Sequence, residues 1–487
     1  MTPGEAPLDE GYRGPVTDQS PDAATGEVRS SRRPSPGMPV VRAATAVASR
    51  GLVAALDALD AVPLTTGRDA LDDVDLVVVE PATFASLPAD ARDAVARWAE
   101  APGRPPIVVW ADRPGGVENL VPLLRERDVV AATGAAVADE LRRATGRDPA
   151  LLPPSFDPAW ANPRRRGAVA APAEPEAARH TVLHDGRPTA LTGVSGRLAV
   201  PPVWLLELAA AGIPIDPGAG PDEGDRAGVA ARRWAYRHHA PWVRARHLLA
   251  LAGVDAPDPD PTVAGILVSK RAEDLPRAIG GFLRQSYPKV ELVVALHGPG
   301  AITQVERLAT DSSVPTTVVH LDNRMSLGEC LNRAIADTSA QVLAKIDDDD
   351  QYGPAFLEDG VHALAYSGAD IVGKGAQFTY LRSDDVTVLR HQGREETFIE
   401  ASPRGASLLV QRDVWEQVRF PHRPRNVDGL FLRGARRLGA SVYANSRWEF
   451  CFAGWADASD EELAGAIPVW EGFQPERVEV PDVAVPI

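Results

Sequence analysis

Cysteine is nearly absent from this sequence of 487 residues, which contains only Cys330 and Cys451. Two cysteines cannot form a disulfide framework or a cysteine-rich zinc site. A chain so poor in thiols fits a reducing compartment best. The sequence therefore predicts a cytoplasmic protein.

Long apolar runs are absent as well. No stretch approaches the roughly 20 consecutive apolar residues that a membrane-spanning helix needs. The first residues are acidic and rich in proline, whereas a signal peptide begins with basic and then apolar residues. We expect no transmembrane segment, so any contact with a membrane would be peripheral.

An excess of positive charge is also missing. The formal net charge is -16, and lysine occurs only at positions 270, 289, 345 and 374. Such a balance argues against a general nucleic-acid binder. The composition, 44% hydrophobic and 24% charged, is that of a folded chain, and its length suits two or three domains.

The order of residue types along the chain predicts its domains. Residues 1–38 are rich in proline, glycine and serine, which predicts a disordered tail. Apolar runs alternate with helical patterns over 39–254, which indicates an α/β domain with a parallel sheet. The expected strands lie at 74–79, 107–110 and 129–131, and the expected helices at 91–98 and 136–143.

A second α/β unit begins after an acidic, proline-rich linker at 255–261. We expect it to span 262–452 and to be followed by a C-terminal extension at 453–487. Its expected strands lie at 263–268, 290–296, 317–321 and 342–346, and its expected helices begin near Leu275, Leu327 and Pro354.

Four consecutive carboxylates, Asp347 to Asp350, follow the apolar strand at 342–346. Ligands bind at the carboxyl edge of a parallel sheet, and adjacent carboxylates repel one another unless a cation or hydrogen bonds compensate them. This pattern predicts a divalent metal, Mn²⁺ or Mg²⁺, that carries a phosphorylated ligand. The alternative is that Asp350 only caps the helix near Pro354, for which one acid would suffice.

Several motifs follow one another in a fixed order along this second unit. They are Ser269-Lys270-Arg271, the segment 278–288, Asn323 with Ser326-Leu327-Gly328 and Leu331-Asn332, Asp347-x-Asp349-Asp350 with Tyr352 and Pro354, the segment 405–410, and the segment 426–439. In this order and spacing they resemble the GT-A domain of the family 2 inverting glycosyltransferases. The resemblance implies transfer of a sugar from a nucleotide-sugar donor to an acceptor hydroxyl.

An inverting transfer needs a Lewis acid at the leaving phosphates and a base on the opposite face of the sugar. The resemblance implies Asp349 and Asp347 as metal ligands and Asp428 as the base, although Asp428 could instead cap a helix beginning at Gly429. The implied donor-binding residues are Ser269, Lys270, Arg271, His297, Asp347 and Asp348, and Gly405 and Ser407 lie on the acceptor side. Lys345 either neutralises phosphate or packs within its strand.

The sequence departs from the family at the end of the second strand. The family usually has an aspartate there that contacts the donor nucleoside, whereas this chain has Leu296-His297-Gly298. Either His297 replaces part of that contact, or donor binding is altered. The departure supports the main alternative, a non-catalytic glycan-binding or scaffold protein derived from such enzymes.

The first half has a fainter resemblance to the C-terminal lobe of GT-B glycosyltransferases, carried by 129–162 and the segment around Glu207 and Gly212. No glycine-rich phosphate loop accompanies it, so we expect an accessory domain. A basic stretch from Arg232 to His247 either holds phosphate or forms a solvated helix face.

The expected fold is therefore a Rossmann-like α/β GT-A domain preceded by an α/β domain of GT-B type. Two glycosyltransferase-like halves on one chain suit an acceptor that is a glycan or polymer, such as a cell-envelope polysaccharide. A sugar nucleotidyltransferase would need a glycine-rich loop after the first strand, and a haloacid-type phosphatase would need an aspartate nucleophile there. Residues 268–272 offer neither.

Overall fold

The computed structural model describes residues 74–156 and 221–453, with gaps at 113–114, 256–259, 272–273, 298–301 and 382–385. It also describes short pieces at 43–46, 52, 62–63, 158, 161, 163, 181–184, 187–191, 209–211 and 467–471. The chain divides into two units, Met1–Val40 and Val41–Ile487. The predicted tail, Glu207, Gly212, and most of the predicted linker and C-terminal extension lie outside the described residues.

The first half contains a parallel sheet, as the alternating pattern predicts. Six of the described strands form it in the order β2-β1-β3-β4-β5-β6, and each neighbouring pair is parallel. Their bounds are β1 (Ala43–Ala46), β2 (Val62–Pro63), β3 (Leu76–Val79), β4 (Ile107–Ala111), β5 (Val129–Ala132) and β6 (Ala150–Leu151). The helices α2 (Pro81–Ser86), α3 (Ala89–Glu100) and α4 (Ala135–Thr145) connect them, and β7 (Thr181–His184) pairs with β8 (Arg187–Leu191).

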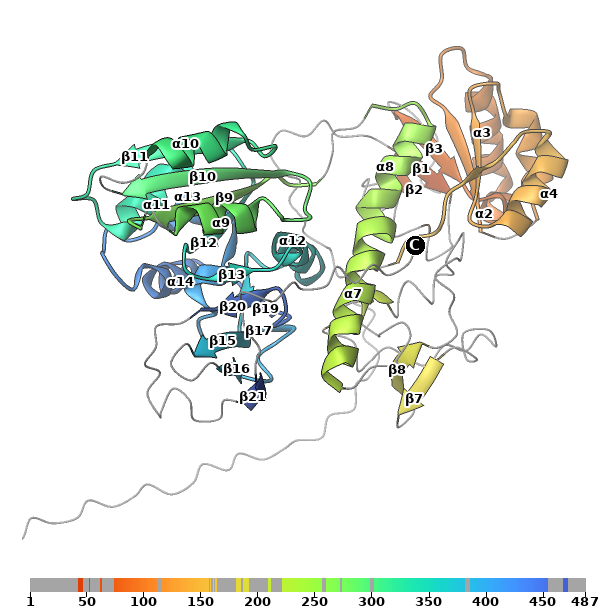
Figure 1. Ribbon diagram of the computed structural model, residues 1–487. Helices are drawn as coiled ribbons and strands as arrows, with labels where there is room; N and C mark the ends of the chain where they lie inside the picture. Colours follow the sequence, from red (N-terminus) through yellow and green to blue (C-terminus); the bar gives the residue numbers. More distant parts are fainter. Residues whose placement is uncertain are drawn as a thin grey trace, which may run out of the picture. The chain divides into compact units, whose positions relative to one another are not determined.

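Two consecutive helices, α7 (Pro221–His239) and α8 (Pro241–Leu251), pack against different cores (Figure 1). In α8, Leu248 and Leu249 are buried with apolar residues of β3 and β4. In α7, Ala235 and Tyr236 are buried with residues of the second half, and α7 contacts α12 (Phe356–Ser367). The helix α7 therefore packs on the second half of the chain as well as on Phe156 of the first, whose ring lies 5.0 Å from that of Tyr236.

The second half is built on a larger, mixed sheet. Eight described strands form it in the order β11-β10-β9-β12-β18-β14-β19-β17. Four are parallel and correspond to the predicted strands: β9 (Val263–Ser269), β10 (Val290–His297), β11 (Thr316–Leu321) and β12 (Val342–Ile346). The others are β14 (Ile371–Lys374), β17 (Thr397–Phe398), β18 (Leu409–Gln411) and β19 (Val442–Asn445), and β18 runs antiparallel to both of its neighbours.

Helices cover both faces of this sheet. On one face, apolar side chains of α11 (Leu327–Ala336), α13 (Arg412–Val418) and α14 (Val427–Arg437) share a core with alternate strand residues. On the other, α9 (Leu275–Phe282), α12 and α7 share a second core, and α10 (Ile302–Thr310) follows β10. The start of α11 is fixed by a capping box, in which Ser326 and Glu329 satisfy each other's backbone N–H groups.

A smaller sheet joins the larger one at its acidic edge. Among the described residues its order is β13-β20-β15-β16-β21. The strands are β13 (Gln351–Tyr352), β15 (Gln377–Leu381), β16 (Val386–Arg390), β20 (Phe450–Phe452) and β21 (Ile467–Glu471). The strand β13 begins directly after Asp350. Its pairing with β20 therefore fixes the segment that follows the carboxylates.

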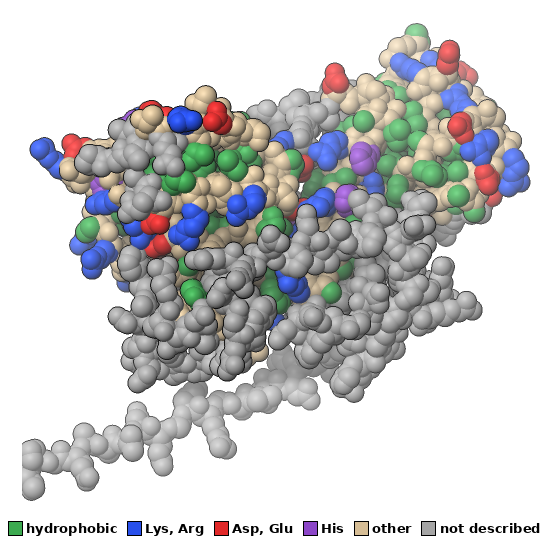
Figure 2. Space-filling view, in the orientation of Figure 1, with side chains coloured by type: hydrophobic (Ala, Val, Ile, Leu, Met, Phe, Trp, Pro, Cys, Tyr) green, Lys and Arg blue, Asp and Glu red, His purple; other side chains and the backbone are tan. Residues whose placement is uncertain are grey.

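The described surface carries both signs of charge. Figure 2 shows acidic and basic side chains interspersed on the described part of one face. Among the described helices, none has the length and apolar character needed to cross a membrane.

Candidate active site

The four carboxylates lie at the carboxyl edge of the larger sheet, where the fully buried strand β12 ends. The backbone N–H of Asp347 donates to the hydroxyl of Tyr352 at 2.9 Å, and this hydroxyl donates to the carbonyl of Ala406 at 2.8 Å. Tyr352 thus ties the acidic loop to the 3-10 turn Gly405–Ser407. The resemblance had assigned this turn to the acceptor side.

Lys345 provides a buried positive charge beside the acids and is only 7% exposed. Its Nζ lies 2.6 Å from Asp347 Oδ1 and 3.5 Å from Asp428 Oδ2. Burial alone would lower the pKa of Lys345, but the two carboxylates outweigh burial and raise it. Lys345 therefore stays charged and joins Asp347 to Asp428.

Asp348 is held by the turn that follows β9. The hydroxyl of Ser269 donates to its carboxylate, and Arg271 binds the same carboxylate and lies 2.9 Å from Asp349 Oδ2. Hydrogen bonding to Asp348 raises the pKa of Arg271 further, against the effect of burial. Because Asp348 is 4% exposed and its oxygens are engaged, it fixes the Ser269 turn against the acidic loop.

Three of the acids form a group that fits a hard cation. Asp347, Asp349 and Asp350 each offer a carboxylate oxygen, and these oxygens all lie within 4.8 Å of one another. Burial and the charges of Asp347 and Asp349 raise the pKa of Asp350 to about 8. Oxygen ligands that repel one another in this way match what Mg²⁺ and Mn²⁺ take in proteins.

Asp428 lies in the first turn of α14 and faces the same site. Its Oδ1 is buried without a hydrogen-bond partner among the described residues. Burial raises the pKa of Asp428, Asp347 adds to this effect, and Lys345 opposes it. A Cβ atom on Gly405 would come within 2.2 Å of Asp428 Oδ2, so only glycine leaves room for the carboxylate in this position.

A polar cleft of about 420 Å³ connects these groups. It is lined by Asp347, Asp428, Gly375, Gln377, Arg390, His391 and residues 402–406. Sequence reasoning had brought Asp347, Asp428 and Gly405 to this place but had missed Arg390, His391 and Arg404. Arg404 directly precedes Gly405 and could have been found there, whereas nothing in the local sequence around Arg390 marks it.

The other predicted residues lie around the cleft in different ways. Ser407 is buried, and its hydroxyl donates to the carbonyl of Arg404 at 2.7 Å and accepts from the N–H of Lys374 at 2.9 Å. His297 is buried at the end of β10, and burial together with Lys270 lowers its pKa. Its Nε2 has no hydrogen-bond partner in the described part of the chain. Lys270 is exposed.

The sequence left open that Asp350 and Asp428 only cap helices, and neither does so. The residue before α12 is Ala355, which makes no side-chain cap, so Asp350 does not cap that helix. Helix α14 begins at Val427 after Asn426, so Asp428 is already inside its first turn. Both capping interpretations are therefore wrong.

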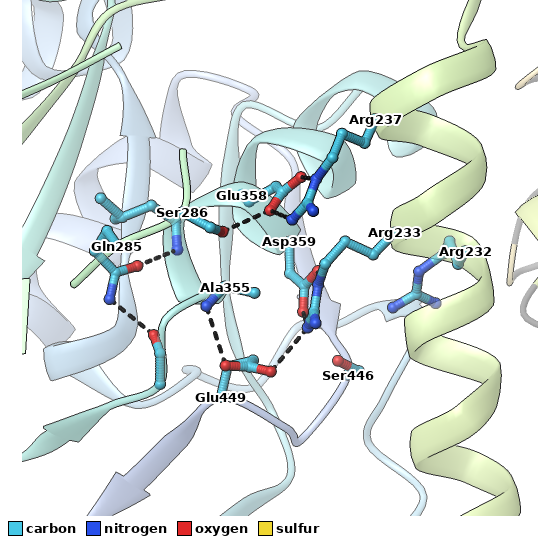
Figure 3. Close-up of polar contacts among 12 residues, drawn as sticks. Arg232, Arg233, Arg237, Gln285, Ser286, Ala355, Glu358, Asp359, Ser446 and Glu449 are labelled. Carbon is cyan, nitrogen blue, oxygen red and sulfur yellow. Dashed lines mark hydrogen bonds and ion pairs between the residues drawn. The ribbon is translucent and has the colours of Figure 1, made fainter. Parts of the chain in front are cut away.

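The turn after the acids is fixed by Gln285, which follows α9, and by Glu449, which precedes β20. Gln285 donates to the carbonyl of Gly353 at 2.7 Å and accepts from the N–H of Leu357 at 3.0 Å. The carboxylate of Glu449 accepts from the N–H of Ala355 at 3.1 Å (Figure 3). A Cβ atom on Gly353 would come within 2.2 Å of Glu449, so a glycine is required where the chain leaves the acids.

Three arginines of α7 bind carboxylates of the second half, and Figure 3 shows the contacts of two of them, Arg233 and Arg237. Arg233 donates to Asp359 at 2.9 and 2.7 Å and to Glu449 at 2.8 Å. Arg237 binds Glu358 at 2.7 and 2.6 Å, and Arg232 lies 2.7 Å from Glu396. These three arginines are thus paired with carboxylates of the protein, which argues against the phosphate interpretation. Arg232 and Arg233 lie at an internal interface, contrary to the interpretation as a solvated face, whereas Arg237 is exposed.

Comparison with known proteins agrees with the geometry. Residues 265–411 match the model of a family described as glycosyl transferase family 2. The glycosyltransferase AglE of Haloferax volcanii is 26% identical over 163 residues, which are 31% of this chain and 53% of AglE. The chain thus matches about half the length of this curated relative.

Solved structures with partial likeness include two that hold nucleotide sugars. S. aureus TarS 1-349 in complex with UDP-GlcNAc is 15% identical, with a TM-score of 0.34 over 42% of this chain and 61% of that chain. Mannosyltransferase PcManGT from Pyrobaculum calidifontis, in complex with GDP-Man and Mn²⁺, is 17% identical, with a TM-score of 0.32 over 42% of this chain and 59% of that chain.

Proposed function

We propose that this chain transfers a sugar from a nucleotide-sugar donor to an acceptor hydroxyl, with inversion at the anomeric carbon. The match of residues 265–411 to the model of glycosyl transferase family 2 supports the proposal. The observation that carries the proposal is the position of Asp428. Its carboxylate has a buried, unpartnered oxygen among the described residues and lines the same cleft as Asp347. A general base needs such an open oxygen within reach of the acceptor hydroxyl.

Asp347, Asp349 and Asp350 would hold a divalent cation, Mn²⁺ or Mg²⁺. When bound, the cation supplies positive charge that stabilises the leaving diphosphate. In this arrangement Asp428 takes the proton of the acceptor hydroxyl as the oxygen attacks the sugar. Lys345, whose Nζ lies 3.5 Å from Asp428 Oδ2, favours the charged form of Asp428. Burial has the opposite effect and keeps the pKa of Asp428 raised.

The donor would lie between the acids and the turn after β9. Arg271 is already bound to Asp348 and lies beside Asp349, which places a guanidinium group at the edge of the metal site. We propose that this group, with Ser269 and Lys270 nearby, contacts donor phosphates. The acceptor we propose is a glycan or polymer such as a cell-envelope polysaccharide, and the proposed location is the cytoplasm.

A non-catalytic glycan-binding protein is the second candidate. It is favoured by the pairing of Arg271 with Asp348 and Asp349, which partly neutralises the acids, and by His297 at the position of the family's nucleoside-binding aspartate. Such a protein would bind sugars and leave nucleotide sugars intact.

Donor hydrolysis separates the two candidates. The full chain would be incubated with Mn²⁺ and a panel of UDP- and GDP-sugars, and release of the nucleoside diphosphate measured. We expect hydrolysis of at least one donor, its loss in Asp349→Asn, and a fall in hydrolysis of about 10²- to 10⁴-fold in Asp428→Asn, since water then takes the place of the acceptor hydroxyl. Asp311→Asn, at an exposed acid after α10, is the control and should match the wild type. Donors that all remain intact would reject the enzymatic proposal.

A further inference from the structure

Arg390 is a half-buried arginine whose side chain has no partner in the described part of the chain. It ends β16 and lines the cleft, and among the described residues its side chain has neither a hydrogen bond nor an ion pair. Its Nε is completely covered by protein. In the register of the smaller sheet Arg390 lies directly opposite Gln377, which also lines the cleft, so the two side chains share one face.

Most other arginines of the second half that are covered to this degree have hydrogen-bond partners, either acids or, for Arg412 and Arg436, backbone carbonyls. Arg271 binds Asp348, and Arg447 binds Glu395 at 2.7 Å. An arginine that is withdrawn from water without a partner is costly, because hydration of the charge is lost and nothing replaces it. The lone Arg390 therefore needs an anion that the described protein does not supply.

Two further basic residues, Arg404 and His391, line the cleft beside Arg390, and the three together are called the cationic wall here. Arg404 lines the same cleft, and its guanidinium stacks on Phe452 at 3.3 Å, which fixes its plane without using its hydrogen-bond donors on a carboxylate. His391 follows Arg390 with a positive φ of 57°, a backbone conformation that is uncommon for histidine, and also lines the cleft. In a chain of formal net charge -16, such a group of basic side chains is a local exception.

We infer that this wall binds an anionic group of the acceptor, a phosphate or a carboxylate, and that Arg390 is its main contact. The planar guanidinium group of arginine can bind either anion through two parallel hydrogen bonds. The inference rests on the proposed function, since it names the acceptor class of the same site. Neutral sugars, which offer only hydroxyl groups, could accept hydrogen bonds from Arg390 but would leave its charge without a counter-ion.

The positions of the acids favour the acceptor over the donor diphosphate as the source of this anion. Of the three acids that we assign to the metal and hence to the donor, Asp347 lines the cleft, whereas Asp349 and Asp350 do not. Arg390 shares the cleft with Asp428, the proposed base that receives the acceptor's proton. An anion bound by Arg390 therefore lies with the acceptor.

Binding of simple sugars to the full-length protein tests the inference. Glucose 6-phosphate, glucuronate and glucose would be titrated against the wild type, Arg390→Gln, Arg390→Lys and Arg394→Gln, with affinity measured by calorimetry or ligand-observed NMR. Arg394 is an exposed arginine four residues along the chain, outside the cleft lining, and serves as the control.

We expect at least one of the two anionic sugars to bind the wild type about tenfold more tightly than glucose, which is the range for a hydrogen bond to a charged group. Arg390→Gln should remove this preference, Arg390→Lys should restore part of it, and Arg394→Gln should keep it. Equal binding of all three sugars by the wild type, or a preference that survives in Arg390→Gln, would overturn the inference. Circular dichroism and thermal melting verify that each variant is folded.

A second arm uses UDP and GDP with Mn²⁺ to distinguish the two sources of anion. If either nucleotide displaces the anionic sugar, or loses affinity in Arg390→Gln as much as the sugar does, Arg390 binds the donor diphosphate and the inference is wrong. Donor hydrolysis by the wild type is measured in parallel. Its absence rejects the proposed transfer, whereas hydrolysis without any anion preference rejects only the acceptor class.

Discussion

The carboxylate of Asp428 lies so close to the backbone of Gly405 that a single methyl group would displace it. In Gly405→Ala the new Cβ would meet Asp428 Oδ2 at 2.2 Å, and the carboxylate is the part best able to move. We expect transfer to fall by about 100-fold or more, because a base misplaced by about 1 Å loses this much. Steady-state transfer rates and thermal melting, measured together, test this expectation.

Gly280→Ala is the matched control, because a Cβ at Gly280 in α9 would meet only the end of the Arg284 side chain, at 4.0 Å. It should retain activity. Full transfer by folded Gly405→Ala would show that the position of Asp428 does not matter and would count against its role as the base.

His239, at the end of α7, makes stability depend on pH. Burial lowers its pKa to about 3, and the charges of Arg244, His238 and His247 contribute. Unfolding releases His239 to an ordinary pKa near 6.5, so the stability it contributes is present above that pH and is lost as the pH falls toward 3. Between pH 7 and pH 5 the loss should be about 2 kcal/mol.

Urea denaturation of the wild type and His239→Gln at both pH values measures this loss. The variant should lose less stability than the wild type over the same interval. His320→Gln, at an exposed histidine of β11, should behave as the wild type does. An identical pH dependence in wild type and His239→Gln would contradict the assignment.

At the level of single residues, the sequence predicted which side chains belong to the site better than it predicted which of them contact each other. It placed Asp347, Asp349 and Asp428 at one site because carboxylates after a strand and at a helix start have recognisable neighbours in the sequence. It could not pair Arg271 with Asp348, which lie 77 residues apart and meet only because β9 and β12 are adjacent. Arg390 was missed for the same reason, since it reaches the cleft through the register of β15 and β16.

At the scale of elements, the strongly periodic segments were predicted well. The strand at 342–346 and the helix at 327–336 have the observed bounds, because an uninterrupted apolar run and a Ser-x-x-Glu capping box mark them locally. The sequence did not predict the smaller sheet. Its strands β13 and β20 have two and three residues, too few to show a period, and they pair across about 100 residues of chain.

Helix α7 is the element whose environment the sequence misjudged most. Burial alone would raise the pKa of Asp359, but Arg233 and Arg232 lower it. Replacing Arg233 by methionine leaves Asp359 and Glu449 without this partner in a buried site. We expect a loss of about 3–5 kcal/mol in urea denaturation, the range for a broken buried ion pair.

The exposed Arg142 offers a control, because it also lies near two acids, Asp139 and Asp148, but in water. Arg142→Met should leave stability unchanged within error, since exposed ion pairs contribute little. If Arg233→Met and Arg142→Met behaved alike, the carboxylates at α7 would have to be hydrated in the folded protein, contrary to their burial.

At the scale of the whole molecule, the linker at 255–261 suggests a boundary in the chain, whereas packing crosses it, because Val41–Ile487 forms one compact unit. Tyr236 of α7 lies in the core of the second half, 5.2 Å from the ring of His362 and 5.5 Å from that of Tyr366. Local composition shows where a chain is polar and rich in proline, but it cannot show which core a preceding helix joins. The proposed catalytic domain therefore needs a helix that precedes the linker.

A fragment of residues 262–453 tests this conclusion, because it keeps every acid of the site and lacks α7. Glu358, Asp359 and Glu449 would lose their arginine partners, and the face that covers Tyr236 would be exposed. We expect a lower melting temperature than that of the full chain and weaker donor hydrolysis, because Glu449 also holds the N–H of Ala355 beside the acidic loop.

A synthetic peptide of residues 221–240, added in trans, should bind the fragment and restore part of its melting temperature. A peptide with Arg232, Arg233 and Arg237 all changed to glutamine keeps the apolar face of α7 and should bind at least about tenfold more weakly, since each charged hydrogen bond contributes to affinity. A fragment that melts like the full chain and ignores both peptides would show that the boundary lies at the linker, and that the arginines of α7 contribute nothing to the site.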